Sequence, residues 1–244
     1  MIVNEKEERI RVSSFFIESM TKLSKRLETV ANMVPEGAYL ADIGSDHAYL
    51  PIALMERKRV SFAQAIDNKM APYLRMKRNV EEAGFASRIA CSLSDGLDAL
   101  HSGVDTLAIC GVGGLLTCEM LEKNAEKLEM IQTILLDPHR DLQAVRKRVS
   151  ALGFHLTDEE MVYEVKTFYT IMKWEKGKPA KPYTQEELLF GPFVIKKKGQ
   201  TFHDYLEIQL KKVSGILDGP LPKDKREPYL KLYRQIKKQL ARYE

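Results

Sequence analysis

Three aspartates follow short apolar runs, at the places where an α/β sheet binds its ligand. Asp46 and Asp95 each come three residues after such a run, and Asp67 directly ends one. A carboxylate after the second strand of an α/β unit accepts hydrogen bonds from ribose hydroxyls, and one after the third strand borders the adenine. The pattern predicts a site for an adenosine-containing cofactor, although each aspartate would also serve as a helix or turn cap.

The first aspartate lies in the stretch 39–51, which is typical of a strand, a ligand-binding loop and a helix start. The apolar run breaks at Gly44, and Pro51 suits the first helical turn, where a missing N–H costs nothing. A dinucleotide site would need glycines at Asp46 and Tyr49. A carboxylate about 4 Å from a pyrophosphate would repel it by about 4 kcal/mol at an effective dielectric of about 20. NAD and FAD are disfavoured, and S-adenosylmethionine, which carries a sulfonium, an ammonium and no phosphate, is favoured.

Strand-like runs and helical stripes alternate over the first 152 residues. The expected strands cover 39–43, 62–66, 88–92, 105–110 and 133–136, and the expected helices cover 23–34, 51–59, 73–83 and 142–152. This alternation predicts an α/β domain whose mainly parallel sheet has helices on both faces.

The pattern changes beyond residue 153. Runs over 154–165 and 168–173 predict an antiparallel hairpin that turns near Lys166, and 175–184 reads as a linker. Apolar residues then recur at heptad-like spacing over 206–217 and 229–243. These stretches predict an antiparallel, coiled-coil-like helical hairpin, whose seam closes either within one chain or between two.

The expected division has three parts. Residues 1–22 form an N-terminal extension, 23–178 a cofactor-binding domain, and 179–244 a linker with a basic helical hairpin.

Positive charge is concentrated in the C-terminal part of the 244-residue chain. The segment 195–244 holds 13 lysine and arginine residues against six aspartate and glutamate residues. The whole chain has a net charge of +4, so the remainder carries about −3. Such an excess favours a polyanionic partner, above all nucleic acid, although solvated helix faces carry similar excesses.

The three cysteines, Cys91, Cys110 and Cys118, form no CxxC pair and have no histidine at zinc-ligand spacing. We expect three buried thiols and no metal site. The chain has no apolar run of about 18 residues and no signal-peptide pattern, which predicts a cytoplasmic protein without a membrane partner.

A glycine-rich turn, 111–114, ends the fourth expected strand, where a class I methyltransferase presents its target. The chain lacks a [DN]-P-P-[YF] motif there, so methylation of an exocyclic amino group is not indicated. Bare glycines allow a flat base to approach the backbone closely. The same glycines would also suit a helix start packed tightly on the sheet.

Several motifs together resemble the TrmK family of bacterial tRNA (adenine-22-N1)-methyltransferases. They are LSKRL at 23–27, LADIGSDHAYLP at 40–51, DGL at 95–97, ICGVGG at 109–114 and FGPF at 190–193. The chain departs from the family pattern at Val112, at Asp67 and at 137–139, where the family has methionine, glutamate and Gln-Pro-Asn. The extension before residue 23 is also unusual.

The resemblance implies a Rossmann-like class I methyltransferase sheet with a C-terminal helical hairpin, S-adenosylmethionine as cofactor and tRNA as partner. The implied cofactor-binding residues are Asp42, Gly44, Ser45, Asp46, His47, Tyr49, Leu50, Pro51, Asp67, Asn68, Asp95, Gly96, Cys110, Gly111 and Gly113.

The implied reaction is methyl transfer to adenine N1, whose lone pair needs positioning more than a strong base. Asp46 would stabilise the forming cation and His47 would contact cofactor or base, although both would also suit a loop cap. The target base would have to be unpaired or flipped outward. Phosphate contacts would come from Lys22, Lys25, Arg26, Lys196, Lys197, Lys198, Lys211, Lys212, Arg234, Lys237 and Lys238.

Two alternatives stay open. A methyltransferase for a small molecule or a protein would not need the basic hairpin, and deletion of 195–244 would leave its activity intact. A non-catalytic RNA-binding or partner-binding module would not bind S-adenosylmethionine. The expected assembly is a monomer or a weak dimer.

Overall fold

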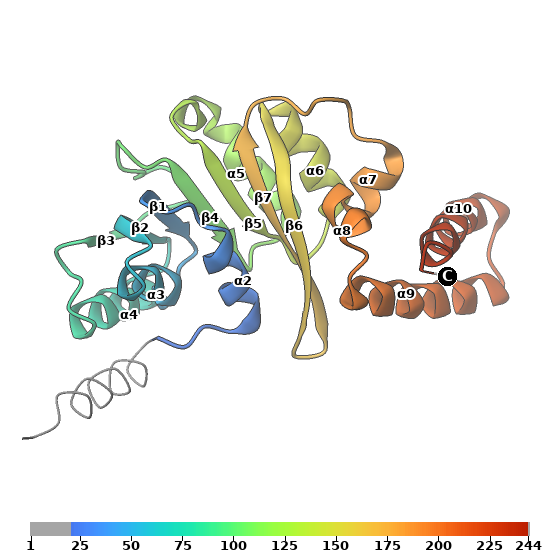
Figure 1. Ribbon diagram of the computed structural model, residues 1–244, viewed down its shortest axis with the longest axis horizontal. Coiled ribbons are helices and arrows are strands. Elements are labelled where there is room, and N and C mark those ends of the chain that lie inside the picture. The colour runs from blue at the N-terminus through green and yellow to red at the C-terminus, as the bar shows by residue number, and fades with distance from the viewer. Residues whose placement is uncertain (1–20, 244) are drawn as a thin grey trace, which may run out of the picture. The chain divides into compact units, whose positions relative to one another are not determined.

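The computed structural model describes residues 21–243 (Figure 1). Seven strands form a mixed sheet in the order β3-β2-β1-β4-β5-β7-β6. The strands are β1 (Ala38–Ile43), β2 (Val60–Asp67), β3 (Ile89–Leu93), β4 (Thr106–Cys110), β5 (Thr133–Asp137), β6 (Phe154–Glu164) and β7 (Thr167–Lys176). The predicted α/β sheet is confirmed, and each expected strand matches an observed one to within a few residues.

Helices connect most of these strands. They are α2 (Lys25–Met33), α3 (Tyr49–Glu56), α4 (Met70–Glu82), α5 (Gly114–Lys123), the 3-10 helix η1 (Ala125–Glu129) and α6 (Leu142–Ala151), followed by α7 (Gln185–Phe190), α8 (Pro192–Lys197), α9 (Gln200–Asp218) and α10 (Lys223–Leu240). The first helix starts at residue 25 rather than 23, because the Ser24 hydroxyl caps it by accepting from the Leu27 N–H.

Two compact units make up the described chain. The first comprises residues 21–110 and 129–131, and the second comprises 111–128 and 132–243. This division does not follow the boundaries predicted at 22/23 and 178/179, which stay a prediction about functionally separate segments. The predicted extension, 1–22, lies outside the described residues apart from its last two.

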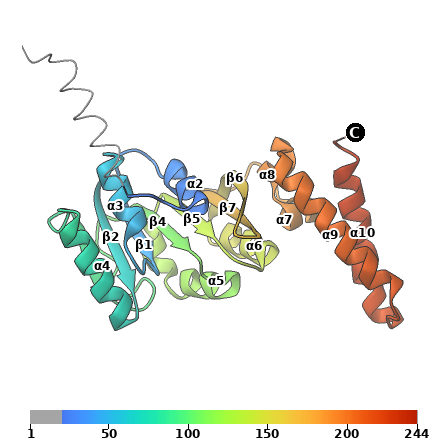
Figure 2. The ribbon, with the colours of Figure 1, turned by 90° about the horizontal axis from the view of Figure 1, so that it is seen from below.

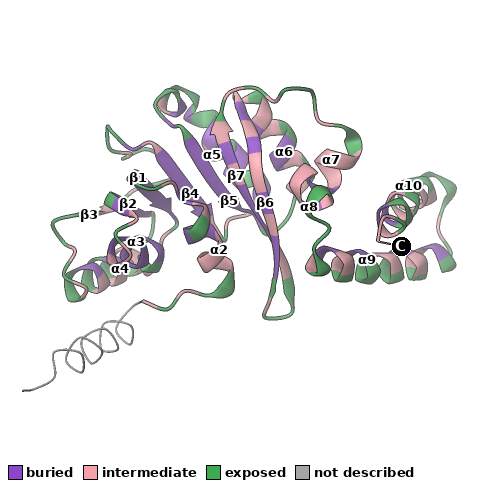
Figure 3. Cartoon of the chain, viewed as in Figure 1, coloured by how far each residue is buried: buried purple, intermediate pink, exposed green. Residues whose placement is uncertain are grey.

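In the first unit, strands β1 to β4 are parallel, with β1 pairing with both β2 and β4 and β2 pairing with β3. The apolar runs of β1 and β4 are almost entirely buried, as expected for parallel strands covered on both faces (Figure 3). The pairing register brings the carboxyl ends of all four strands to one edge of the sheet.

In the second unit, β7 pairs antiparallel with both β5 and β6. Val165 and Lys166 both have positive φ, 46° and 60°, and form the two-residue turn between β6 and β7. Positive φ at both central positions is the geometry that matches the twist of a hairpin. The predicted hairpin is confirmed, but β7 continues to Lys176, so the expected linker start at residue 175 is wrong.

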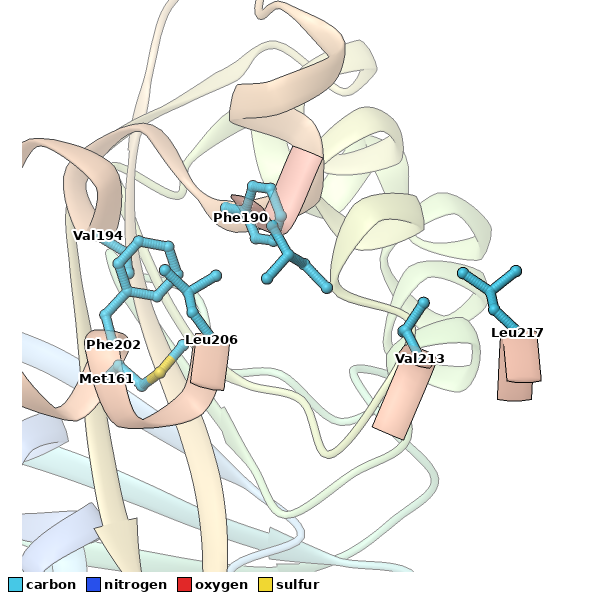
Figure 4. Packing of buried hydrophobic residues seen from close by; sticks show 8 residues of the cluster. Met161, Phe190, Val194, Phe202, Leu206, Val213 and Leu217 are labelled. Carbon is cyan, nitrogen blue, oxygen red and sulfur yellow. The ribbon is translucent and has the colours of Figure 1, made fainter. Parts of the chain in front are cut away.

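The helical hairpin consists of α9 and α10, which pack against each other and lie side by side in both views (Figures 1 and 2). Its heptad residues join a buried cluster that also includes residues of β6, α7 and α8 (Figure 4). The heptad residues of α9 and α10 therefore pack on each other within this chain. The short helices α7 and α8 were not predicted.

Only one of the three cysteines fits the expectation of a buried thiol. Cys118 is buried, whereas Cys91 and Cys110 are half-exposed, because both lie at less covered parts of the sheet. Cys91 lines a groove of about 290 Å³ between α4 and β3, and partial burial raises the pKa of its thiol.

Within residues 21–243, no helix is long and apolar enough to cross a membrane. The same part of the chain contains no cluster of three or more histidine, cysteine, aspartate or glutamate side chains suited to a metal ion.

Candidate functional site

The strand register of the first unit brings three predicted site residues into one row. Ile43 pairs with Ile66 of β2 and with Ile109 of β4. The next residues along these strands are Gly44, which follows β1, and Asp67 and Cys110, which end β2 and β4; all three therefore stand at the same level at the carboxyl ends. This is the edge at which open α/β sheets bind their ligands.

Backbone bonds hold the loop after β1 against β2. The N–H groups of Gly44 and Ser45 both donate to the Ile66 carbonyl, at 2.8 and 3.1 Å. Gly44 has a φ of 74°, a left-handed conformation that suits glycine. Hydrogen bonds to β2 therefore set the backbone conformation of this loop ahead of α3.

Asp42 lies beneath this loop and is only 5% exposed. Its Oδ2 accepts a hydrogen bond of 2.5 Å from the Ser45 hydroxyl. Burial raises the pKa of Asp42 to about 6, whereas the Ser45 hydrogen bond and the Arg26 charge act in the opposite direction. A carboxylate held in this way exchanges its proton close to neutral pH.

Asp46, the first catalytic candidate, forms an ion pair with Arg75 of α4 through Nε and Nη2. His47, the second, lies with Nε2 3.6 Å from Asp46 Oδ2 and stacks on Tyr49 at 4.9 Å between ring centroids. The Asn79 side-chain amide Nδ2 donates a hydrogen bond of 2.9 Å to the His47 carbonyl oxygen. The Asp46 charge is therefore already shared with a cation.

The second and third strands end in linked polar loops. Asp67 Oδ1 accepts from the Lys69 N–H at 2.9 Å, which is the capping interaction that the sequence left open. Asn68 donates to Asp95 Oδ1 at 3.2 Å, and the Ser94 N–H donates to the Asp67 carbonyl at 3.0 Å. The residues predicted to meet ribose and adenine are thus brought together.

Not every predicted residue lies at this edge with an accessible side chain. Leu50 and Pro51 are buried within α3, so the structure gives them a packing role. Gly96 has a φ of 51° in the loop after β3, and Tyr49 is 43% exposed.

The second unit carries the predicted target-side glycines. Gly111 has a φ of 75°, and its N–H donates to the Asp137 carbonyl at 3.2 Å. His139 follows β5, and its backbone N–H donates to the Val112 carbonyl at 3.4 Å. Its ring contacts the Tyr169 ring of β7 edge to face, with 5.8 Å between the ring centroids. A Cβ added at Gly111 would lie 3.6 Å from His139 Nε2, so the His139 ring borders the glycine turn and Tyr169 lies behind it in ring contact.

The last glycines of this turn begin α5. Gly113 is the residue before the helix, and a Cβ added there would lie 3.8 Å from Arg140 Nε. At Gly114 an added Cβ would overlap the Arg140 carbonyl and come within 2.8 Å of Val145 Cγ2. Tight packing of α5 on α6 is therefore one reason for glycine at Gly114.

Some of the predicted basic residues form short ion pairs with carboxylates of the chain, and others are more exposed. Lys197 contacts Asp158 and Glu160 at 2.7 and 2.8 Å, and Lys238 contacts Glu186 at 2.8 Å. Others lie at exposed positions of the hairpin or of the chain near α2, with Arg234 3.7 Å from Glu227 and Lys237 5.7 Å from the Tyr233 ring centre. The remaining exposed members are Lys22, Lys25, Lys196, Lys198, Lys211 and Lys212, and Arg26 is half-buried.

The residues at the edge of the first unit fit a cofactor that carries positive charge and hydroxyl groups. Asp67 and Asp95 offer carboxylates, Asp46 is balanced by Arg75, and Asp42 is buried beneath the loop. No sequence pattern points to Arg75 and Asn79, which lie about 30 residues from their partners, or to Tyr169, which only the fold brings to His139.

Comparisons with known proteins agree with this geometry. Residues 23–172 match the methyltransferase domain family. The chain is 37% identical to the tRNA (adenine(22)-N(1))-methyltransferase of Bacillus subtilis over 186 residues, which cover 74% of this chain and 78% of that protein.

Two solved structures extend the likeness to the hairpin. The B. subtilis m1A22 tRNA methyltransferase TrmK has a TM-score of 0.82 at 29% identity, covering 90% of this chain and 99% of that one. M. capricolum TrmK in complex with S-adenosyl-homocysteine has a TM-score of 0.81 at 26% identity, covering 90% and 98%.

The fold, the row of site residues and the family match together define a class I methyltransferase. Within that class, the chain belongs to the TrmK family of tRNA (adenine(22)-N(1))-methyltransferases.

Proposed function

We propose that the chain transfers a methyl group from S-adenosylmethionine to N1 of adenine 22 in tRNA. The observation that carries this proposal is the 37% identity to the B. subtilis enzyme over three quarters of the chain. The arrangement of carboxylates at the edge of the first unit supports the same cofactor.

On the cofactor side, the residues after β1, β2 and β3 would hold the ligand. Asp67 would accept hydrogen bonds from the ribose hydroxyls, and the loop of Asn68 and Asp95 would border the adenine. Asp42 would support the Gly44 loop from below, through Ser45. The cofactor supplies a methyl group on a positively charged sulfur.

The target side requires positioning more than proton transfer, because adenine N1 has a free lone pair at neutral pH. Gly111 leaves room for a flat base, and the rings of His139 and Tyr169 would stack on it. Since N1 lies on the Watson–Crick edge, a paired target has to be turned out of its helix first.

Asp46 and His47 stay candidates for direct contact with the reacting groups. The Arg75 ion pair makes Asp46 a weak partner for a new cation unless Arg75 moves away. A positioning role for the loop is therefore the simpler assignment.

The α9–α10 hairpin would hold the body of the tRNA through phosphate contacts. Lys196, Lys211 and Lys212 are exposed on its side of the second unit, whereas Lys197 and Lys238 are held in ion pairs. We propose that residues 23–178 form the catalytic part and 179–244 the RNA-binding part of a cytoplasmic enzyme, monomeric or weakly dimeric.

The test is a methylation assay with purified protein, S-adenosylmethionine and unmodified tRNA, followed by digestion and mass spectrometry. We expect 1-methyladenosine in that tRNA and none in a matched tRNA with guanosine at position 22. Absence of the product from every adenine-22 tRNA would contradict the proposal. A protein or small-molecule substrate would be favoured if activity survived deletion of 195–244.

A further inference from the structure

A buried ion pair links α6 to the segment that carries the helical hairpin. Arg146 of α6 is 1% exposed and Glu159 of β6 is fully buried, and Arg146 Nε donates to Glu159 Oε1 at 2.8 Å. Removal of these charges from water is costly, and further hydrogen bonds offset part of that cost. Arg146 Nη1 and Glu159 Oε2 have such bonds, whereas Arg146 Nη2 is buried without a hydrogen-bond partner among residues 21–243. The remaining partners identify the segment of the chain that the pair binds.

Nearly all the further bonds of this pair go to one segment, α7 and α8. Arg146 Nη1 donates to the carbonyls of Leu188 and Leu189, at 2.9 and 3.2 Å. Glu159 Oε2 accepts from the Phe193 N–H, at 3.2 Å. The two charged side chains thus bind the end of α7 and the start of α8 directly through the backbone.

Gly191, between α7 and α8, completes this contact. Its φ is 97°, and a Cβ added there would come within 2.5 Å of Glu159 Oε2 and 2.8 Å of Arg146 Nη2. Only glycine allows the turn to lie against the pair. We refer to Arg146, Glu159 and Gly191 as the joint, which gives a physical reason for glycine in the motif at 190–193.

Each end of the hairpin has an additional tie to this region. Lys197 of α8 contacts Asp158 and Glu160 of β6 and donates to the Glu159 carbonyl at 2.9 Å. Glu186 of α7 contacts Lys238 and Arg242 and accepts from Gln239, near the end of α10. The buried cluster of Figure 4 includes residues of β6, α7, α8, α9 and α10.

The neighbouring residue of α6, Val145, touches the target-side turn. Val145, next to Arg146, packs against Gly114 so closely that no side chain fits there. One helix therefore contacts both the glycine turn through Val145 and α7, which precedes the hairpin, through Arg146. The joint and α6 thus connect the turn to the segment from which the hairpin extends.

We propose that the joint sets the reach of the hairpin and thereby selects which adenine of a bound tRNA is methylated. This inference rests on the proposed function. A tRNA held rigidly at its body presents one nucleotide to the turn, whereas a loosely held one presents several. Misplacement of about 1 Å is enough to reduce a rate about 100-fold.

The main test replaces both charges with apolar residues, Arg146→Met and Glu159→Leu, because such double replacements commonly preserve stability. The matched control is Arg148→Met with Glu122→Leu, which removes a more exposed ion pair between α6 and α5. We expect the joint variant to lose kcat/KM for tRNA by about tenfold or more. It should also methylate adenines other than adenine 22, mapped by mass spectrometry.

In both double variants, S-adenosylmethionine affinity should stay within about twofold of the original, because the cofactor side lies in the other unit. A joint variant that folds and methylates adenine 22 alone at the original efficiency would overturn the inference. Lys197→Met, which removes the contacts to Asp158, Glu160 and the Glu159 carbonyl but leaves the buried pair in place, provides a second variant that is expected to fold. The Lys197→Met variant should methylate adenines other than adenine 22. If Lys197 served only as a phosphate contact, its loss would instead lower the salt dependence of tRNA binding and leave the methylated position unchanged.

A measurement without RNA separates this inference from the proposed function. Spin labels at Leu116→Cys on α5 and Ile208→Cys on α9, both exposed positions, would be introduced after replacement of the native cysteines. Pulsed electron resonance should give one narrow distance in the parent and in the control, and a broad distribution in the joint variant. A narrow, unchanged distribution would refute the joint even if no tRNA were methylated.

Discussion

Replacement of Asp42 by asparagine should stabilise the protein, and the gain should grow with pH. Burial raises the pKa of Asp42 from its ordinary value of 3.8 to about 6. The folded protein therefore binds this proton more tightly than the unfolded chain does, and stability falls as pH rises from about 4 to about 6. Asparagine removes the titration and can still accept the Ser45 hydrogen bond.

The expected magnitude follows from the difference between the two pKa values. A gap of about two units corresponds to about 3 kcal/mol once the carboxylate is fully ionised. The stability difference between Asp42→Asn and the parent should thus rise from about 1.5 kcal/mol at pH 5 to about 3 kcal/mol at pH 7. Above pH 7 it should be flat.

The measurement is urea unfolding of both proteins at several pH values without cofactor. Ser45→Ala provides a matched test. Without the Ser45 hydrogen bond the pKa of Asp42 rises further, so the decrease in stability should extend to higher pH. A stability difference that does not change between pH 5 and pH 7 would refute this account of the buried carboxylate.

Three further outcomes are expected. Tyr169→Ala should reduce tRNA methylation while leaving S-adenosylmethionine affinity unchanged in calorimetry. Tyr169→Phe should retain most methylation activity, and an equal loss of activity in the two variants would argue against stacking. Lys211→Gln with Lys212→Gln should lower the slope of log affinity against log salt by about one per lysine in a tRNA binding titration, and an unchanged slope would exclude phosphate contacts. Asp67→Asn, which can still cap the Lys69 N–H, should weaken S-adenosylmethionine binding by about tenfold or more, and an unchanged Kd would remove Asp67 from the ribose site.

Local sequence patterns were sufficient to predict the sheet and the loops at its edge. Parallel strands buried on both faces read as continuous apolar runs, and Gly44 and Gly111 mark where the chain leaves them. Asp67 and Asp95 could be placed for the same reason, because loops after parallel strands meet at one edge.

Contacts between distant charged residues could not be predicted. Arg146 reads as one of several cations on an amphipathic helix, and nothing in its neighbourhood points to Glu159, 13 residues away. Arg75 and Asp46 present the same difficulty at a separation of 29 residues. The short helix α7 had a readable signal, since Thr184 and Glu187 form a capping box, but six residues are too few for an apolar period.

The contacts of α8 with β6 also bear on solubility. β6 is the last strand of the sheet, and an uncovered edge strand is a template for pairing with another chain. Lys197 places a charge across Asp158 and Glu160, and the irregular pairing of β6 near Asp158 interrupts its regular edge. Loosening α8 together with the helical hairpin would thus leave an edge strand open to pairing with another chain.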